Sequence, residues 1–279
     1  EMSASLVGSE MCIRDSLLCL YDHQHGGCCN RLYRNQKKKE FGEKKMIGFY
    51  DYTVILTYLS ILSGTTGIIL CLNGIGHPYL GMFFLLFSGL CDTFDGKVAR
   101  TKKNRTEKMK KFGIQIDSLS DLIAFGVLPA CIGIALLRCG LRTQMPFGFT
   151  RFIFEKNPML VQIILTIIAV LYVLAAMIRL AYFNVMEEEG ENKDEKGEKI
   201  YMGLPVTSAA LIFPAVLLVH ILVRADLTLL YFGVMIVTGL LFICKFHIKK
   251  PKGKGIAVLV LLGILEFIIL ILVLTKIKG

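Results

Sequence analysis

Long apolar runs are the feature that most restricts how this chain can fold. A helix needs roughly 20 apolar residues to cross about 30 Å of hydrocarbon. Seven segments of about that length occur, at 52–73, 78–100, 112–137, 159–185, 204–223, 227–246 and 255–277. With 54% hydrophobic residues, the chain is also too apolar for an ordinary soluble domain. The sequence therefore predicts an all-α fold, a polytopic helical bundle in a membrane.

The net charge of +10 has its explanation in the connections between these runs. The 101–111 connection carries six Lys or Arg residues, and 245–254 carries five Lys. Basic connections on one side of a membrane are typical of the cytoplasmic face, although four basic residues in 138–157 run against this rule. We expect a multi-pass protein of a bacterial-type cytoplasmic membrane. Without aromatic residues interleaved among the basic ones, nucleic acid is not an expected partner.

The ends of the chain differ from its middle. Residues 1–45 lack the basic start, long apolar centre and cleavage site of a signal peptide. We expect 1–45 to be a non-native or disordered extension. The predicted organisation is then a transmembrane domain at 46–250, followed by an additional C-terminal helix within 251–279.

Acidic residues interrupt the second and third apolar runs. Asp92 and Asp95 are three residues apart, and Asp117 and Asp121 are four apart, so each pair shares one helix face. The two helices are consecutive and antiparallel, so their carboxylates can meet at one depth. An Asp near the bilayer centre costs about 2.5–3.5 kcal/mol. For Asp92 and Asp95 alone, a position at the membrane surface is an equally good explanation.

A divalent cation would offset both the burial and the mutual repulsion of these carboxylates. Mg²⁺ and Mn²⁺ favour carboxylate oxygens and are commonly shared with substrate phosphates. Gly96 and Ala99 are small, which lets a ligand approach the backbone, and Arg100 offers a planar fork suited to diphosphate. The pattern favours a metal-dependent phosphate site.

The combined string D-x-x-D-G-x-x-A-R, followed by G-x-x-x-D-x-x-x-D from Gly113, resembles the signature of the CDP-alcohol phosphotransferase family. One difference is the connection between Arg100 and Gly113. It has twelve residues, 101–112, and is longer than the family's usual connection by about one helical turn. The resemblance covers roughly 50–245, and its surroundings, such as GLPVTSAA at 203–210, are most similar to the phosphatidylserine synthase group.

This resemblance implies a core of six transmembrane helices, with 255–277 as an extra helix, and a homodimer. It also implies site residues. Asp92, Asp95 and Asp117 would bind the metal, and Asp121 would complete the cluster or act as general base. The CDP group would be held by Gly96, Ala99, Arg100 and Gly113.

The residues that bind the acceptor alcohol are not part of this motif. Arg179 and Asn184 are candidates for binding the acceptor, although anchoring at the membrane surface explains Arg179 equally well.

The implied activity is transfer of a phosphatidyl group from CDP-diacylglycerol to the hydroxyl of L-serine, in the lipid bilayer and with the site facing the cytoplasm. A sister enzyme that uses glycerol 3-phosphate or inositol phosphate is the nearest alternative. A cation transporter with intramembrane carboxylates is a more remote one, because it would not account for Gly96, Ala99, Arg100 and Gly113 at their spacings.

Overall fold

The computed structural model describes most of the chain after residue 47. Contacts divide the chain into Glu1–Phe49 and Tyr50–Gly279, and all the helices discussed below belong to the second unit. The extension expected at 1–45 lies outside the described residues. The described ranges are 48–73, 77–102, 105–142, 156–189, 200–223, 225–249 and 253–278.

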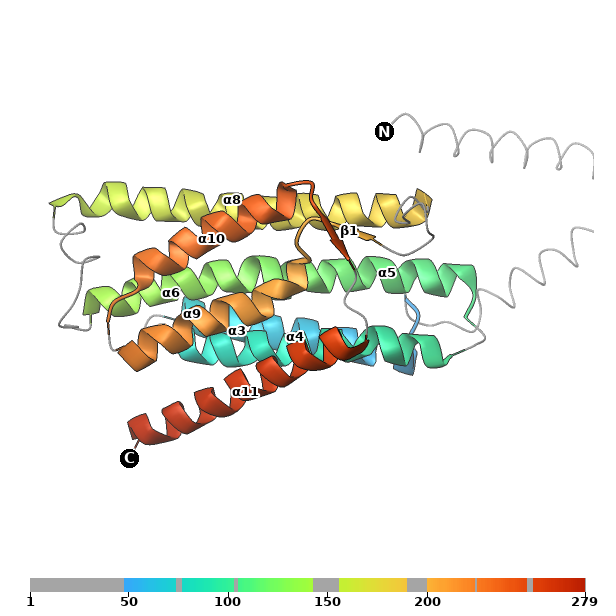
Figure 1. Ribbon diagram of the computed structural model, residues 1–279, viewed down its shortest axis with the longest axis horizontal. Coiled ribbons are helices and arrows are strands. Elements are labelled where there is room, and N and C mark those ends of the chain that lie inside the picture. The colour runs from blue at the N-terminus through green and yellow to red at the C-terminus, as the bar shows by residue number, and fades with distance from the viewer. Residues whose placement is uncertain are drawn as a thin grey trace, which may run out of the picture. The chain divides into compact units, whose positions relative to one another are not determined.

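Helices make up nearly all of this unit (Figure 1). The long ones confirm the predicted all-α bundle. They are α3 (Ile55–Leu72), α4 (Pro78–Thr101), α5 (Glu107–Asp121), α6 (Leu128–Arg142), α8 (Pro158–Glu189), α9 (Ala209–Val223), α10 (Thr228–Ile243) and α11 (Gly253–Lys278). Short 3₁₀ turns precede α3 (η1, Tyr52–Val54) and α9 (η3, Val206–Ser208).

Helices α5 and α6 form one continuous rod through the π-helical turn η2 (Leu122–Val127). This rod corresponds to the apolar run at 112–137, but it begins five residues earlier, at Glu107. Thr106 caps it, because its side-chain oxygen accepts a hydrogen bond from Met109 N at 3.3 Å. The first turns are rich in Lys, so hydropathy alone could not show that they are helical.

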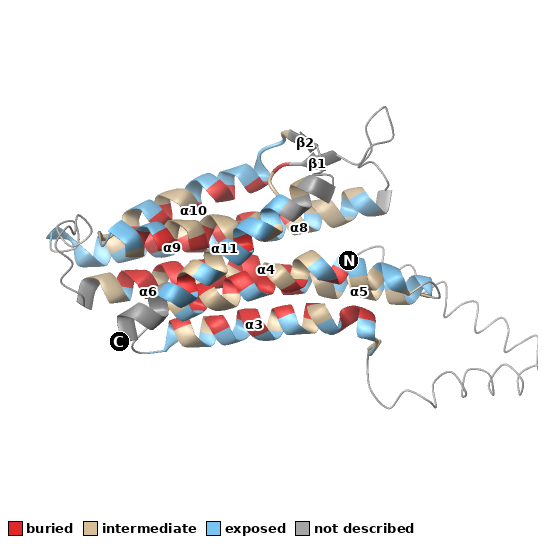
Figure 2. Cartoon of the chain, turned by 60° about the horizontal axis from the view of Figure 1, so that its bottom comes forward, coloured by how far each residue is buried: buried red, intermediate tan, exposed pale blue. Residues whose placement is uncertain are grey.

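Apolar helices of this length identify a multi-pass membrane protein. Four helical segments are long and apolar enough to cross a membrane: Tyr52–Leu72, Glu107–Gly140, Pro158–Glu187 and Val206–Val223. Apolar stretches at Thr228–Ile243 and Val258–Leu272 are shorter. Helix α4 is not among the four because polar and charged residues occupy its second half. Figure 2 shows buried residues concentrated where α4, α6 and α9 meet.

One short pair of strands joins two connections. β1 (Ile200–Met202) pairs antiparallel with β2 (His247–Lys249), with Tyr201 opposite Ile248. Gly203 follows β1 with a positive φ of 74°, a conformation that favours glycine. The sequence analysis did not predict these strands, and residues 190–199 before β1 lie outside the described ranges.

Side-chain hydrogen bonds fix α3, α4 and α5 against one another. The Ser63 hydroxyl donates to the Phe84 carbonyl at 2.8 Å, and the Ser88 hydroxyl donates to the Ser60 carbonyl at 3.1 Å. From α5, the Ser120 hydroxyl donates to the Thr57 carbonyl at 3.2 Å. These buried bonds set the depth of α4 and α5 relative to α3, and with it the depth of the acidic residues.

Candidate functional site

The four acidic residues of α4 and α5 meet in the structure. Carboxylate oxygens of Asp92, Asp117 and Asp121 all lie within 4.8 Å of one another. The Asp95 carboxyl group lies within hydrogen-bonding reach of Asp117. Asp95 and Asp121 are buried, with 8% and 9% of their surface exposed. We call these four residues the acidic cluster.

The acidic cluster fits a divalent cation. Two oxygens on opposite sides of a six-coordinate Mg²⁺ or Ca²⁺ are about 4–5 Å apart, and the oxygens of Asp92, Asp117 and Asp121 are no more than 4.8 Å apart. All the donors are hard carboxylate oxygens, which suit Mg²⁺ and Mn²⁺ better than softer metals. These side chains could therefore hold a metal ion, and the remaining coordination positions would be open to water or substrate.

A pocket of about 300 Å³ adjoins the acidic cluster, and we call it the α4–α5 pocket. Asp95 and Asp117 line it together with three of the small residues that the sequence singled out: Gly96, Ala99 and Gly113. A Cβ atom on Gly96 would meet only the end of the Arg100 side chain, at 3.9 Å. Gly96 therefore leaves open space beside the carboxylates, where a ligand can approach the backbone of α4.

Arg100 is placed differently from the other predicted CDP-binding residues. Its side chain is exposed and turns back along α4, where Nε donates to the Gly96 carbonyl at 2.8 Å. It is not among the residues that line the α4–α5 pocket. The basic side chains that line the α4–α5 pocket are Arg105 and Lys110, and the sequence analysis selected neither of them. The lengthened 101–112 connection was the signal that could have drawn attention to Arg105.

The two candidate acceptor residues lie on α8. Arg179 is buried, with 5% of its surface exposed, and its Nε donates to the Leu204 carbonyl at 3.2 Å. A position this buried disfavours simple anchoring at the membrane surface. The Asn184 side-chain amide donates to the Ser118 hydroxyl at 2.8 Å, and Ser118 directly follows Asp117. Asn184 therefore reaches the helix that carries half of the acidic cluster, through a residue between Asp117 and Asp121.

A second pocket, of about 190 Å³, has Asp92 among its lining residues. We call it the α4–α9–α11 groove. Its walls are mainly apolar, from α4 (Leu86, Leu90), α9 (Leu211) and α11 (Leu259, Val260). The polar residues of its lining are Asp92, Thr93, Thr207 and Ser208. One member of the acidic cluster thus borders both a polar site and an apolar groove.

Comparison with known proteins gives one family. Its model, described as CDP-alcohol phosphatidyltransferase, matches residues 53–244. A CDP-diacylglycerol–serine O-phosphatidyltransferase of Methanocaldococcus jannaschii is 30% identical over 212 residues, which cover 76% of this chain and 78% of that protein. A protein of the same name from Saccharomyces cerevisiae is 32% identical over 179 residues, 62% of this chain and 54% of the relative.

A relative of the same name from Mycobacterium tuberculosis is 26% identical over 155 residues. The match covers 56% of this chain and 44% of the mycobacterial protein, so the chain spans less than half of that relative's length. The family match is much broader, since residues 53–244 make up well over half of the chain and include the acidic cluster and the lining of the α4–α5 pocket. The protein therefore belongs to the CDP-alcohol phosphatidyltransferase family.

Proposed function

We propose that this protein transfers the phosphatidyl group of CDP-diacylglycerol to the hydroxyl of L-serine, forming phosphatidylserine and releasing CMP. The observation that carries the proposal is the acidic cluster beside the α4–α5 pocket, on two consecutive helices. The names of the archaeal, yeast and mycobacterial relatives support serine as the acceptor. Glycerol 3-phosphate and inositol phosphate are the alternatives that these names do not favour.

In this reaction the serine oxygen forms a bond to the lipid-bearing phosphorus, and the bond from that phosphorus to the CMP oxygen breaks. Asp121 takes the proton of the serine hydroxyl, as a carboxylate within reach of a weak nucleophile can do. Asp92, Asp95 and Asp117 would hold Mg²⁺ or Mn²⁺, and Asp121, whose carboxylate lies in the same group of oxygens, would complete this set or act as the base. When bound, the cation supplies positive charge that offsets the negative charge of the diphosphate and the departing CMP.

The α4–α5 pocket would hold the CDP group, with Gly96, Ala99 and Gly113 giving access to the helix backbones. Arg179 and Asn184 remain the proposed acceptor residues. We propose that one hydrocarbon chain of the lipid lies in the α4–α9–α11 groove, since Asp92 is part of its lining and the rest of the lining is mainly apolar. The metal-bound headgroup and the lipid chain would then meet at a single residue of α4.

The basic connections 101–111 and 245–254 support a site that faces the cytoplasm, in a membrane of the bacterial cytoplasmic type. The division into a transmembrane domain at 46–250 and an additional helix within 251–279 also belongs to this proposal. The homodimer rests on the family resemblance alone and stays a prediction.

The test is CMP release by the purified protein in detergent, with CDP-diacylglycerol, Mg²⁺ or Mn²⁺, and one acceptor at a time. We expect release with serine, and loss of at least a hundredfold in Asp121→Asn if that residue is the base. Thermal unfolding of the variant shows whether it is folded. Release only with glycerol 3-phosphate or inositol phosphate would overturn the acceptor. Ion flux without CMP release would support a transporter instead.

A further inference from the structure

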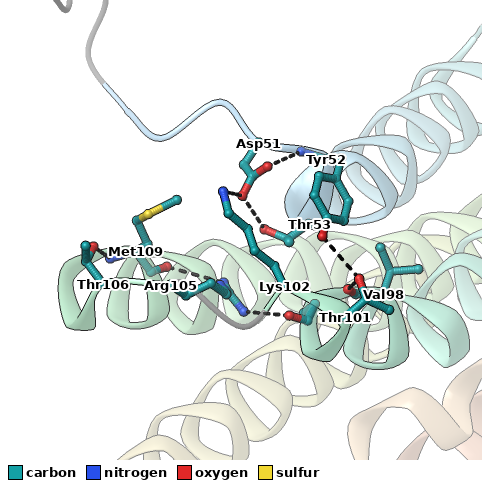
Figure 3. Close-up of polar contacts among 10 residues, drawn as sticks. Asp51, Tyr52, Thr53, Val98, Thr101, Lys102, Arg105, Thr106 and Met109 are labelled. Atoms are coloured by element: carbon teal, nitrogen blue, oxygen red, sulfur yellow. Dashed lines mark hydrogen bonds and ion pairs between the residues drawn. The ribbon is translucent and has the colours of Figure 1, made fainter.

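The connection between α4 and α5 adds a residue to the α4–α5 pocket. Helix α4 ends at Thr101 and α5 begins at Glu107, and Arg105 lies between these two helix ends. Figure 3 shows Arg105 in this connection, beside the start of α5 and the end of α4. Arg105 lines the pocket together with Asp95, Gly96 and Asp117.

Two backbone carbonyl groups orient the Arg105 guanidinium. Nη1 donates to the Ala99 carbonyl at 3.5 Å, and Nη2 donates to the Met109 carbonyl at 3.3 Å. Both contacts are longer than a typical hydrogen bond of 2.9–3.0 Å. They hold the group in place but use only part of its five donors. The Nε atom is buried and has no hydrogen-bond partner among the described residues.

Gly113 makes room for this arrangement. A Cβ atom at Gly113 would lie 2.6 Å from Arg105 Nη2, a distance that would displace the guanidinium. The glycine that the sequence pattern singles out on α5 therefore lets Arg105 lie against the helix. The other basic residue of the lining, Lys110, is exposed, and its ammonium donates to Glu107 at 2.7 Å. Arg105 is thus the more buried cation of this pocket.

We propose that Arg105 binds the diphosphate of the CDP-linked lipid. A planar guanidinium matches phosphate oxygens in a way that an ammonium does not, and a buried Nε without a partner gains a hydrogen bond when phosphate arrives. The proposal rests on the proposed function for the identity of the substrate. The resemblance assigned the diphosphate-binding guanidinium to Arg100. In this proposal it comes instead from Arg105, in the lengthened connection.

A purely structural role is the competing explanation, because the contact with Ala99 also satisfies a carbonyl group at the end of α4. The two explanations differ in their dependence on phosphate. A structural clamp affects folding and affects cytidine and CDP equally. A phosphate-binding residue affects CDP and leaves cytidine, which has no phosphate, unchanged.

The experiment measures binding of CDP and of cytidine to the full-length protein in detergent with Mn²⁺, by calorimetry. We expect Arg105→Gln to weaken CDP binding about 10- to 100-fold, the effect of losing hydrogen bonds to a charged group, with cytidine binding and the unfolding temperature unchanged. Arg105→Lys should give a smaller loss, because it keeps the charge but not the fork. Gly113→Ala should also weaken CDP binding, since it displaces the guanidinium.

Lys108→Gln is the matched control, because Lys108 lies in the same segment, is exposed and is not part of the pocket lining. It should bind CDP like the wild type. Three results would each overturn the role of Arg105. The first is an Arg105→Gln protein that binds CDP as tightly as the wild type, the second is an equal loss of its affinity for CDP and cytidine, and the third is a wild-type protein that does not bind CDP at all. If Arg105→Gln weakens CDP binding and serine gives no CMP release, the role of Arg105 stands and the proposed acceptor fails.

Discussion

The Tyr172 hydroxyl of α8 donates a hydrogen bond to the Phe125 carbonyl of η2 at 2.8 Å. In an α-helix this carbonyl would accept from the N–H four residues later, but residue 129 is a proline and has no N–H. Tyr172 is 2% exposed, so water does not reach the carbonyl in its place. A side chain of another helix therefore satisfies the backbone of the rod that carries Asp117 and Asp121.

Replacing Tyr172 by Phe should destabilise the protein by about 1–3 kcal/mol, because it removes the hydroxyl that donates to the buried Phe125 carbonyl. Chemical unfolding in detergent measures the change. The matched background is Pro129→Ala, which restores an N–H four residues after Phe125. There the same Tyr172→Phe change should cost less, and an equal cost in both backgrounds would contradict this account.

The acidic cluster predicts stabilisation by metal. Mn²⁺ at about 100 times its dissociation constant should stabilise the folded protein by about 2.7 kcal/mol, a rise of several degrees in the unfolding temperature. Asp117→Asn should lose most of this rise. Asp226→Asn is the control, since Asp226 lies just before α10, accepts from Thr228 N at 3.1 Å and lies outside the acidic cluster. A rise in Asp117→Asn as large as in the wild type would show that the metal binds elsewhere.

The α4–α9–α11 groove predicts a dependence on lipid chain length. Val260→Phe should fill part of the groove and raise KM for CDP-diacylglycerol with long chains more than for an eight-carbon analogue. The rise should be about 5- to 30-fold if about 1–2 kcal/mol of apolar contact is lost. Leu261→Phe is the control, because Leu261 is 68% exposed and is not part of the groove lining. An equal effect of the two substitutions would mean that the lipid chain binds elsewhere.

The contact between Asp51 and Lys102 predicts a dependence on pH (Figure 3). Lys102 Nζ donates to the Asp51 carboxylate at 2.6 Å, and this holds the pKa of Asp51 below its ordinary value. Because the folded pKa is the lower one, the contact stabilises the protein above the unfolded pKa of about 3.9. That stabilisation is lost as the pH falls through the folded pKa.

Asp51→Asn keeps an acceptor for Tyr52 N but removes the charge. The wild type should therefore unfold at a higher temperature than Asp51→Asn at pH 7, and the difference should shrink at pH 3. Lys102→Met should show the same pattern. A difference between wild type and Asp51→Asn that stays constant across this range would contradict the predicted charge effect.

Apolar run lengths predicted the helices well, because hydrocarbon thickness fixes how long each one must be. They missed the first turns of α5, where Lys residues extend the helix beyond the apolar run. The helix period predicted that Asp92 and Asp95 share one face of α4 and that Asp117 and Asp121 share one face of α5. It could not show that Arg100 turns back on Gly96 while Arg105 reaches the pocket, because both outcomes depend on the path of the connection. The π turn after Asp121 and the strands have no local signature in the sequence.

The pairing of β1 with β2 has a consequence for the order in which the protein assembles. Leu204, two residues after β1, accepts from Arg179 and donates its own N–H to the Leu241 carbonyl at 3.2 Å. The segment before α9 therefore lacks its partners until residues 241–249 have been synthesised. The surroundings of Arg179 are completed only when the ribosome has passed α10, so a nascent chain arrested earlier would insert its first helices while Arg179 still lacks this environment.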